Sequence, residues 1–186
     1  MHLPVFPLPV FLLPDGVTRL RIFEPRYLKL VSIASKGQGF VLSVYSHEHP
    51  LNVPNWGSWV EITDFSSDKE LLHIDIKCRG LLSLSDISMD EDKLRFANCA
   101  EIDHWPKDQS FNNTFPLAEK LKRIYQQYPE QASLYPEPQF ENANWVYSRF
   151  LEMLPLSFEN KMLFLKPDSM LDAEDFLKTL ILGDNN

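Results

Sequence analysis

The residues of this sequence that could bind a metal ion are His47 and His49, on either side of Glu48. Residues i and i+2 of a strand share a face, so both imidazoles could reach one ion if His73, His104 or an aspartate supplied a third ligand. Loops rich in His, Glu and Pro are common, however, and this spacing is not diagnostic of a site. We therefore favour a solvated loop, and we predict no metal and no cofactor.

Two further groups of reactive side chains also favour structural interpretations. Asp90, Glu91 and Asp92 are consecutive and lack the alternating acids and glycine of a calcium loop, which indicates a solvated turn. Cys78 and Cys99 are the only cysteines and lie in strand-like segments. Two cysteines do not make a disulfide framework, so we expect free, buried thiols in a reducing compartment.

Catalytic motifs are missing from the sequence. None of the six glycines begins the phosphate-binding pattern that ends in Lys and Ser or Thr, and no nucleophile elbow occurs. No serine is accompanied by a recognisable base. We therefore predict that the chain is not an enzyme.

Composition narrows the classes of partner. The chain has 186 residues, 44% of them hydrophobic, which is enough for one domain or two small ones. Its net charge of −8, without a basic run, argues against binding to nucleic acid or to an acidic membrane. The apolar start is short, proline-rich and without a positive leader, so we expect neither a signal peptide nor a membrane span, and a cytoplasmic protein.

The first forty residues predict a strand, a turn, a second strand and a helix. Prolines 4, 7 and 9 cannot donate to a sheet, so the first strand should be an edge strand or an interrupted one. Pro14-Asp15-Gly16 predicts a turn in which glycine takes the positive φ. Leu20 and Ile22 indicate a half-buried strand, and Glu24-Pro25 opens a helix with an apolar face.

The period of the hydrophobic residues then changes along the chain. Residues 39–103 alternate as short strands with turns between them, which favours a closed or nearly closed sheet, with a bulge at Arg79-Gly80. After a polar linker at 106–116, residues 117–186 have helical periodicity. Asn142 or Asn144 can cap one helix, and Ser169 with Asp172 is typical of a capping box. The predicted fold is α+β, with a β-rich lobe at 1–105.

Two segments of this lobe resemble a known family. Pro4-Val5-Phe6-Pro7-Leu8, followed by Leu20 to Tyr27, is similar to the signature of the amino-terminal, substrate-binding domain of Lon ATP-dependent proteases. The resemblance implies a PUA-like β pseudo-barrel with one helix, then a helical lobe, without the ATPase and peptidase modules. The sequence departs from the family at Arg79-Gly80-Leu81-Leu82, where a glycine and an Arg-Phe pair are usual.

Candidate binding residues lie between the two signature segments. The run from Pro9 to Pro14 is more apolar than one edge strand needs, and Trp56 lies in a turn beside Pro54. Exposed apolar groups of this kind suit binding of polypeptide, although they could instead pack on the core or between the lobes. The candidates are Pro9, Val10, Phe11, Leu12, Leu13, Pro14 and Trp56. We assign the signature residues Phe23, Glu24, Pro25, Arg26 and Tyr27 a structural role at a helix start.

The leading hypothesis is a non-catalytic module that binds unfolded or extended polypeptide, or a protease or chaperone partner, with a link to protein quality control or proteolysis. A small-molecule pocket in the β lobe or between the lobes is the alternative. A metal-dependent hydrolase built on His47 and His49 is a third hypothesis, and the acidic charge opposes RNA binding.

Overall fold

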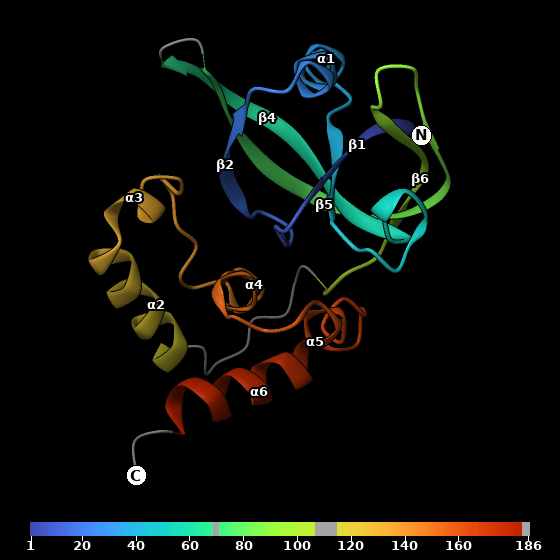
Figure 1. Cartoon of the computed structure of the whole chain (residues 1–186). Helices are drawn as coiled ribbons and strands as arrows, with labels where there is room; N and C mark the ends of the chain where they lie inside the picture. Colours follow the sequence, from blue (N-terminus) through green and yellow to red (C-terminus); the bar gives the residue numbers. More distant parts are fainter. Residues whose placement is uncertain (69–70, 107–114, 184–186) are drawn as a thin grey trace. The chain divides into compact units, whose positions relative to one another are not determined.

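The change in hydrophobic period near residue 103 coincides with a division of the structure. The computed structural model describes residues 1–68, 71–106 and 115–183, and the chain forms two units, Met1–Ile102 and Asp103–Asn186. The first unit is a sheet with one α-helix and the second is helical (Figure 1), which confirms the α+β fold. Most of the expected linker 106–116 lies outside the described residues, so its bounds stay a prediction.

Six strands make up the sheet of the first unit. Their order is β2-β5-β4-β3-β1-β6, and β5 also pairs with β6, so all strands except β2 close into a barrel. Among the described strands, β2 is therefore the one with a single neighbour (Figure 1). The strands are β1 (His2–Leu8), β2 (Val17–Ile22), β3 (Phe40–Val44), β4 (Trp56–Asp68), β5 (Leu71–Met89) and β6 (Arg95–Ile102).

Strand β1 lies inside the sheet and not at its edge, and its pairing is interrupted, which is the second of the two alternatives that its prolines predicted. Its first half pairs with β6 as far as Val5, and its second half pairs with β3 from Val5 onward. Pro4 and Pro7 therefore each have a partner strand on one side only. A proline is tolerated in such a half-paired strand because its nitrogen can face the open side.

Local backbone features agree in part with the sequence analysis. Arg79 is the extra residue where the β4–β5 register shifts between Trp59 and Val60, so the expected bulge is present. The turn after Pro14 is also present, and the Gly16 N–H donates to the Leu13 carbonyl oxygen at 2.9 Å. Asp15, and not Gly16, takes the positive φ, of 64°, which aspartate tolerates better than most residues.

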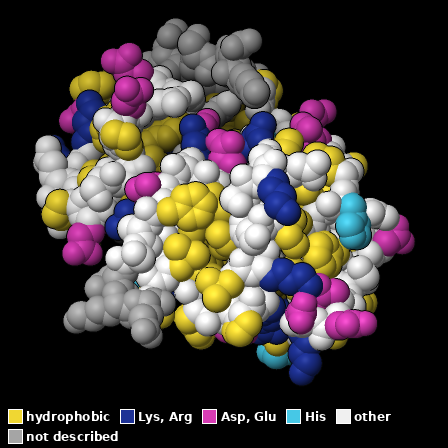
Figure 2. All heavy atoms as spheres, turned by 90° about the horizontal axis from the view of Figure 1, so that it is seen from above, with side chains coloured by type: hydrophobic (Ala, Val, Ile, Leu, Met, Phe, Trp, Pro, Cys, Tyr) yellow, Lys and Arg dark blue, Asp and Glu magenta, His cyan; other side chains and the backbone are white. Residues whose placement is uncertain are grey.

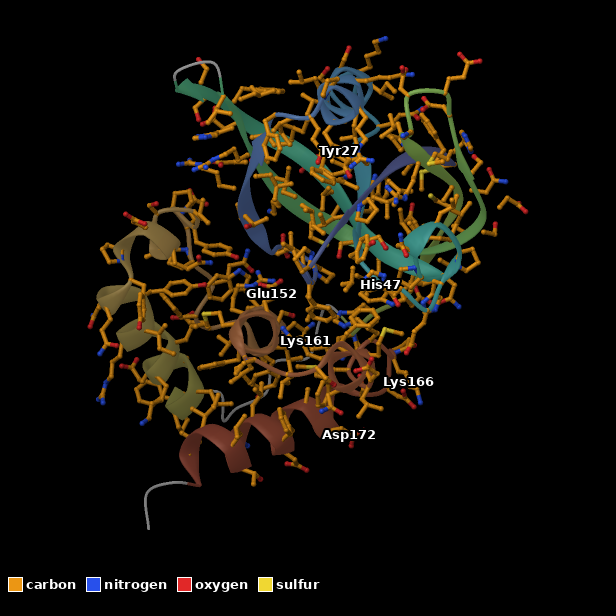
Figure 3. All side chains as sticks on the ribbon, viewed as in Figure 1. Tyr27, His47, Glu152, Lys161, Lys166 and Asp172 are labelled. Carbon is orange, nitrogen blue, oxygen red and sulfur yellow. The ribbon has the colours of Figure 1, made fainter. Side chains whose placement is uncertain are left out.

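Helix α1 (Pro25–Ala34) covers the barrel with the face that its periodicity predicts. Pro25 occupies the first turn, where its missing N–H has no intrahelical partner, and Tyr27, Leu30, Val31 and Ala34 are buried. These four side chains join the main core cluster with residues of five strands. The Tyr27 ring points toward the strands (Figure 3) and stacks on Phe6 at 3.8 Å between ring centroids.

The second unit contains five helices in the described residues. Asn142 caps α4, since its Oδ1 accepts from the Trp145 N–H at 3.3 Å. The capping box expected at Ser169 is wrong, because the Ser169 hydroxyl instead donates to the Lys166 carbonyl oxygen and accepts from the Trp105 indole. The helices are α2 (Phe115–Gln127), α3 (Pro129–Ala132), α4 (Ala143–Met153), α5 (Phe158–Met162) and α6 (Met170–Leu182). No helix of the described residues is long and apolar enough to cross a membrane.

An aromatic cluster with a buried cation forms the core around α4. Trp145 contacts Tyr125, Tyr135 and Phe140 edge to face, with ring centroids 5.4–6.2 Å apart. Arg149 is 1% exposed, lies over the Trp145 ring and makes two bonds to Glu152, of 2.8 and 2.9 Å. Glu152 thus supplies the partner that the buried charge of Arg149 needs. Figure 3 shows Glu152 beside Lys161, which donates to its carbonyl oxygen.

The half-buried His104 makes the stability of the second unit depend on pH. Burial lowers the pKa of its imidazole to about 4, and its Nε2 donates to the Phe164 carbonyl oxygen at 3.1 Å. In the unfolded chain His104 takes up a proton near pH 6.5, whereas in the folded chain it stays neutral down to about pH 4. The free energy of unfolding therefore falls as the pH is lowered from about 6.5 to 4.

We predict a loss of about 3 kcal/mol in the free energy of unfolding over this range. In urea titrations at a series of pH values, His104→Gln should flatten the slope, and an unchanged slope would refute the assignment.

Candidate functional site

A groove of about 470 Å³ lies in the first unit along β2. Its lining runs from Phe6 to Val10, from Arg19 to Arg21 and from Phe23 to Tyr27 without Pro25, and it includes Tyr45 and Arg95. The end of β1, the edge strand β2 and the start of α1 therefore meet here. We call it the β2 groove. The volume falls within the range of ligand sites in proteins.

The floor of the β2 groove is aromatic and its rim carries exposed apolar side chains. Phe6 and Tyr27 form the stacked, buried pair that joins β1 to α1. Phe23 is 66% exposed and Tyr45 is 41% exposed. Figure 2 views the molecule from the side of α1 and shows hydrophobic side chains at the surface among charged ones. Exposed aromatic groups beside a concave surface are typical of binding sites.

Burial also fixes the protonation of Tyr27. Loss of solvent raises the pKa of its phenol, and the nearby Arg26 and Arg95 guanidinium groups lower it by less. The hydroxyl therefore stays neutral at physiological pH and can donate a hydrogen bond. A neutral phenol of this kind is not suited to act as a base.

Two of the four arginines that line the β2 groove are paired with carboxylates. Arg19 binds Asp75, directly opposite on β5, through two bonds of 2.6 and 2.7 Å. The Arg26 Nη2 lies 2.6 Å from the Glu24 Oε2, so these two side chains at the helix start form an ion pair. The Arg26 guanidinium also lies 4.8 Å from the centre of the Tyr27 ring. Its buried Nε has no hydrogen-bond partner among the described residues.

The other two arginines leave the β2 groove positively charged. Arg95 donates from Nε to the Leu51 carbonyl oxygen at 2.7 Å. Because a carbonyl group carries no net charge, this bond does not neutralise the guanidinium group. Arg21 is exposed, and the described part of the chain gives it no carboxylate partner. Four arginines against Glu24 and Asp75 leave an excess of two positive charges, in a chain whose net charge is −8.

The free edge of β2 adds backbone groups to the site. Leu20 and Ile22 point into the core, whereas Arg19 and Arg21 are exposed. The strand pairs with β5 along all six residues and has no described partner on its other side. Such an edge presents N–H and C=O groups that another extended chain can pair with.

The structure divides the seven candidate residues into two groups. Pro9 and Val10 lie in the β2 groove, exposed and half-buried respectively. Phe11, Leu12, Leu13 and Trp56 are buried, which agrees with the alternative that these apolar residues pack on a core. Leu12 joins the barrel core and accepts from the Ser58 hydroxyl at 2.6 Å, and Phe11 packs on Trp56 at 5.9 Å. Pro14 is half-buried, and whether any of the seven contacts polypeptide stays a prediction.

Four of the five signature residues have a second position that sequence reasoning missed. Phe23, Glu24, Arg26 and Tyr27 all line the β2 groove, although they were expected to serve the helix start alone. Phe23 could have been noticed in the sequence, because an apolar residue at this position belongs neither to the alternating pattern of the strand nor to the apolar face of the helix. Tyr45 and Arg95 come from distant segments and gave no local signal.

Among the described residues, the weak metal and thiol candidates do not come together. His47 packs on Tyr45 at 4.9 Å between ring centroids, and His49 bonds to the Ser46 hydroxyl at 3.0 Å. Within the described ranges, no three metal-ligating side chains come together. Asp90 and Asp92 both accept from Lys29. Cys78 and Cys99 are free and buried, as expected.

Comparison with known proteins identifies the fold. No family model and no curated protein matches this chain. The chain is similar to the crystal structure of a Lon N-terminal domain protein from Xanthomonas campestris, with a TM-score of 0.72 and 24% identity over 95% of this chain and 96% of that one. It is also similar to the N-terminal domain of Mycobacterium avium complex Lon protease, with a TM-score of 0.64 and 10% identity over the same shares. The chain therefore has the Lon N-terminal domain fold, which confirms the resemblance stated from the sequence.

Stability measurements should separate the buried and exposed signature residues. We predict that Tyr27→Ala lowers the free energy of unfolding by about 3 kcal/mol, because it removes the partner of Phe6 from the core. Phe23→Ser should change it by less than about 0.5 kcal/mol, because that ring is largely in solvent. Urea unfolding of both variants tests this. Equal losses would show that Phe23 has a structural role.

Proposed function

We propose that this chain is a non-catalytic module that binds extended polypeptide in the β2 groove. The observation that carries the proposal is the position of the groove: an open, apolar depression runs along the described strand that has a single neighbour. A bound segment would add a strand beside β2 and place alternate side chains in the groove. Main-chain hydrogen bonds then give affinity and the groove gives selectivity.

The dimensions of β2 set the length of the bound segment. The strand has six residues, which corresponds to a length of about 20 Å. Phe23 and Tyr45 supply exposed aromatic surface for apolar side chains of the segment. Pro9 and Val10 extend this surface, which retains part of the candidate stretch identified from the sequence.

The fold supports the same function without establishing it. A fold can host unrelated functions, so the argument depends on the groove and its edge strand. Both similar structures are Lon N-terminal domains, and one is part of a protease. We extend the proposal to a cytoplasmic role in protein quality control or proteolysis, in which a protease or chaperone takes over the bound segment.

A small-molecule site is the second candidate function, and the size and polar lining of the groove favour it. A volume of about 470 Å³ with converging arginines and a neutral tyrosine suits a small anionic ligand. The two functions differ in how much of the edge strand they need. A small ligand would occupy the space near Arg26 and Arg95 and would leave the β2 backbone unpaired.

Binding of a permanently unfolded protein tests the leading proposal. A reduced and alkylated globular protein carrying a fluorophore should bind the full chain, with a rise in fluorescence anisotropy. We predict that Phe23→Ser weakens this binding about tenfold, which corresponds to about 1.4 kcal/mol for the loss of an exposed aromatic contact.

The matched control is Phe65→Ser. Phe65 lies on β4, is 51% exposed and does not line the β2 groove. This variant should bind as the unmodified chain does. No binding at tens of micromolar, or equal weakening by both substitutions, would contradict the proposal.

A further inference from the structure

The charge of the β2 groove specifies which polypeptides it should accept. Its four arginines, set against Glu24 of the lining and the neighbouring Asp75, leave an excess of two positive charges, whereas the whole chain carries a net charge of −8. This contrast places an attractive field for anions at one position on an otherwise acidic protein. Such complementarity selects partners and speeds their association.

We infer that the β2 groove selects acidic segments, in which apolar side chains alternate with aspartate or glutamate. This inference rests on the proposed binding of extended polypeptide. In a strand paired with β2, apolar side chains would face the aromatic floor. The alternate side chains would lie on the same side as Arg21, since successive residues of a strand point to opposite faces.

Two arginines have unused capacity to bind a carboxylate. Arg21 has no carboxylate partner in the described ranges, and Arg95 bonds to a carbonyl oxygen through Nε. A guanidinium group presents five N–H donors, so Arg95 retains donors for a ligand after this bond and its hydrogen bond to the Tyr27 hydroxyl. Charge-assisted bonds between arginine and carboxylate are about twice as strong as neutral ones. Arg21 and Arg95 are thus the residues that would bind the acidic side chains of the segment.

Arg26 contributes in a different way. Its Nε is buried without a described hydrogen-bond partner, although Glu24 holds another nitrogen of the same group. A buried donor without a partner costs free energy, and a ligand oxygen would remove that cost if the Arg26 side chain turned this nitrogen toward the β2 groove.

Arginines on an edge strand also have an alternative explanation. Charged side chains on an edge discourage pairing with other copies of the sheet. That role requires no complementary partner, so it predicts binding that does not depend on the charge of the peptide. The two explanations therefore differ in a measurable quantity.

Labelled peptides of identical apolar sequence provide the test. Three peptides, each with an amidated C-terminus, carry Asp, Asn or Lys at the alternate positions, and their dissociation constants for the full chain are measured by fluorescence anisotropy. We expect the Asp peptide to bind about tenfold more tightly than the Asn peptide and the Lys peptide to bind most weakly. Raising the salt from about 50 mM to about 500 mM should reduce the preference, because exposed charges are screened.

Substitution of Arg21 tests whether this residue causes the preference for the Asp peptide. Arg21→Glu should abolish the advantage of the Asp peptide, and Arg21→Gln should reduce it. Lys36→Glu is the matched control, because it changes the charge equally at an exposed residue beyond the opposite end of α1. It should leave the advantage intact.

Each contrary result overturns a defined part of the account. Equal binding of all three peptides refutes the acidic preference and leaves polypeptide binding standing. The same outcome for Arg21→Glu and Lys36→Glu also refutes it. If a free C-terminus strengthens binding more than the Asp residues do, the groove recognises a chain end and the inference is wrong. Failure of all peptides to bind refutes both this inference and the proposed function.

Discussion

The closure of the barrel by β5 is the constraint on which the rest of the structure depends. This strand has 19 residues, more than β6 can match, so its second half closes the barrel while its first half extends beyond it. Strand β2 pairs with that first half and thereby acquires a free edge. The bulge at Arg79 lies between the two halves, where a change in strand direction is needed.

The start of α1 completes the site because of where β2 ends. The chain leaves β2 at Ile22 and enters the helix at Pro25, so only two residues separate the edge strand from the helix. Tyr27 fastens this start to β1 through its stack on Phe6. The residues that make the turn, Phe23 and Glu24, are consequently placed at the groove. The same short segment therefore fastens the helix to the barrel and lines the groove.

Much of the fold was predictable from local patterns. Alternation of apolar residues located the strands, and the apolar face of α1 was predicted because a helix repeats every 3.6 residues. The position of β1 was not predictable, because proline argues against a central strand and only the half-by-half pairing makes it acceptable. The candidate site was predicted in part. Pro9 and Val10 line it, but the burial of Leu12 and the approach of Tyr45 and Arg95 depend on pairing between distant strands.

Hydrogen exchange of the first unit is the most direct test of the central claim, which is that polypeptide pairs with the free edge of β2. The account predicts that a saturating unfolded protein slows exchange of amides in Val17–Ile22, with smaller changes at the start of α1 and none at the Phe65 end of β4. Slower exchange arises because newly paired N–H groups must open before they exchange. Protection that spares β2 and appears on other strands would contradict the account.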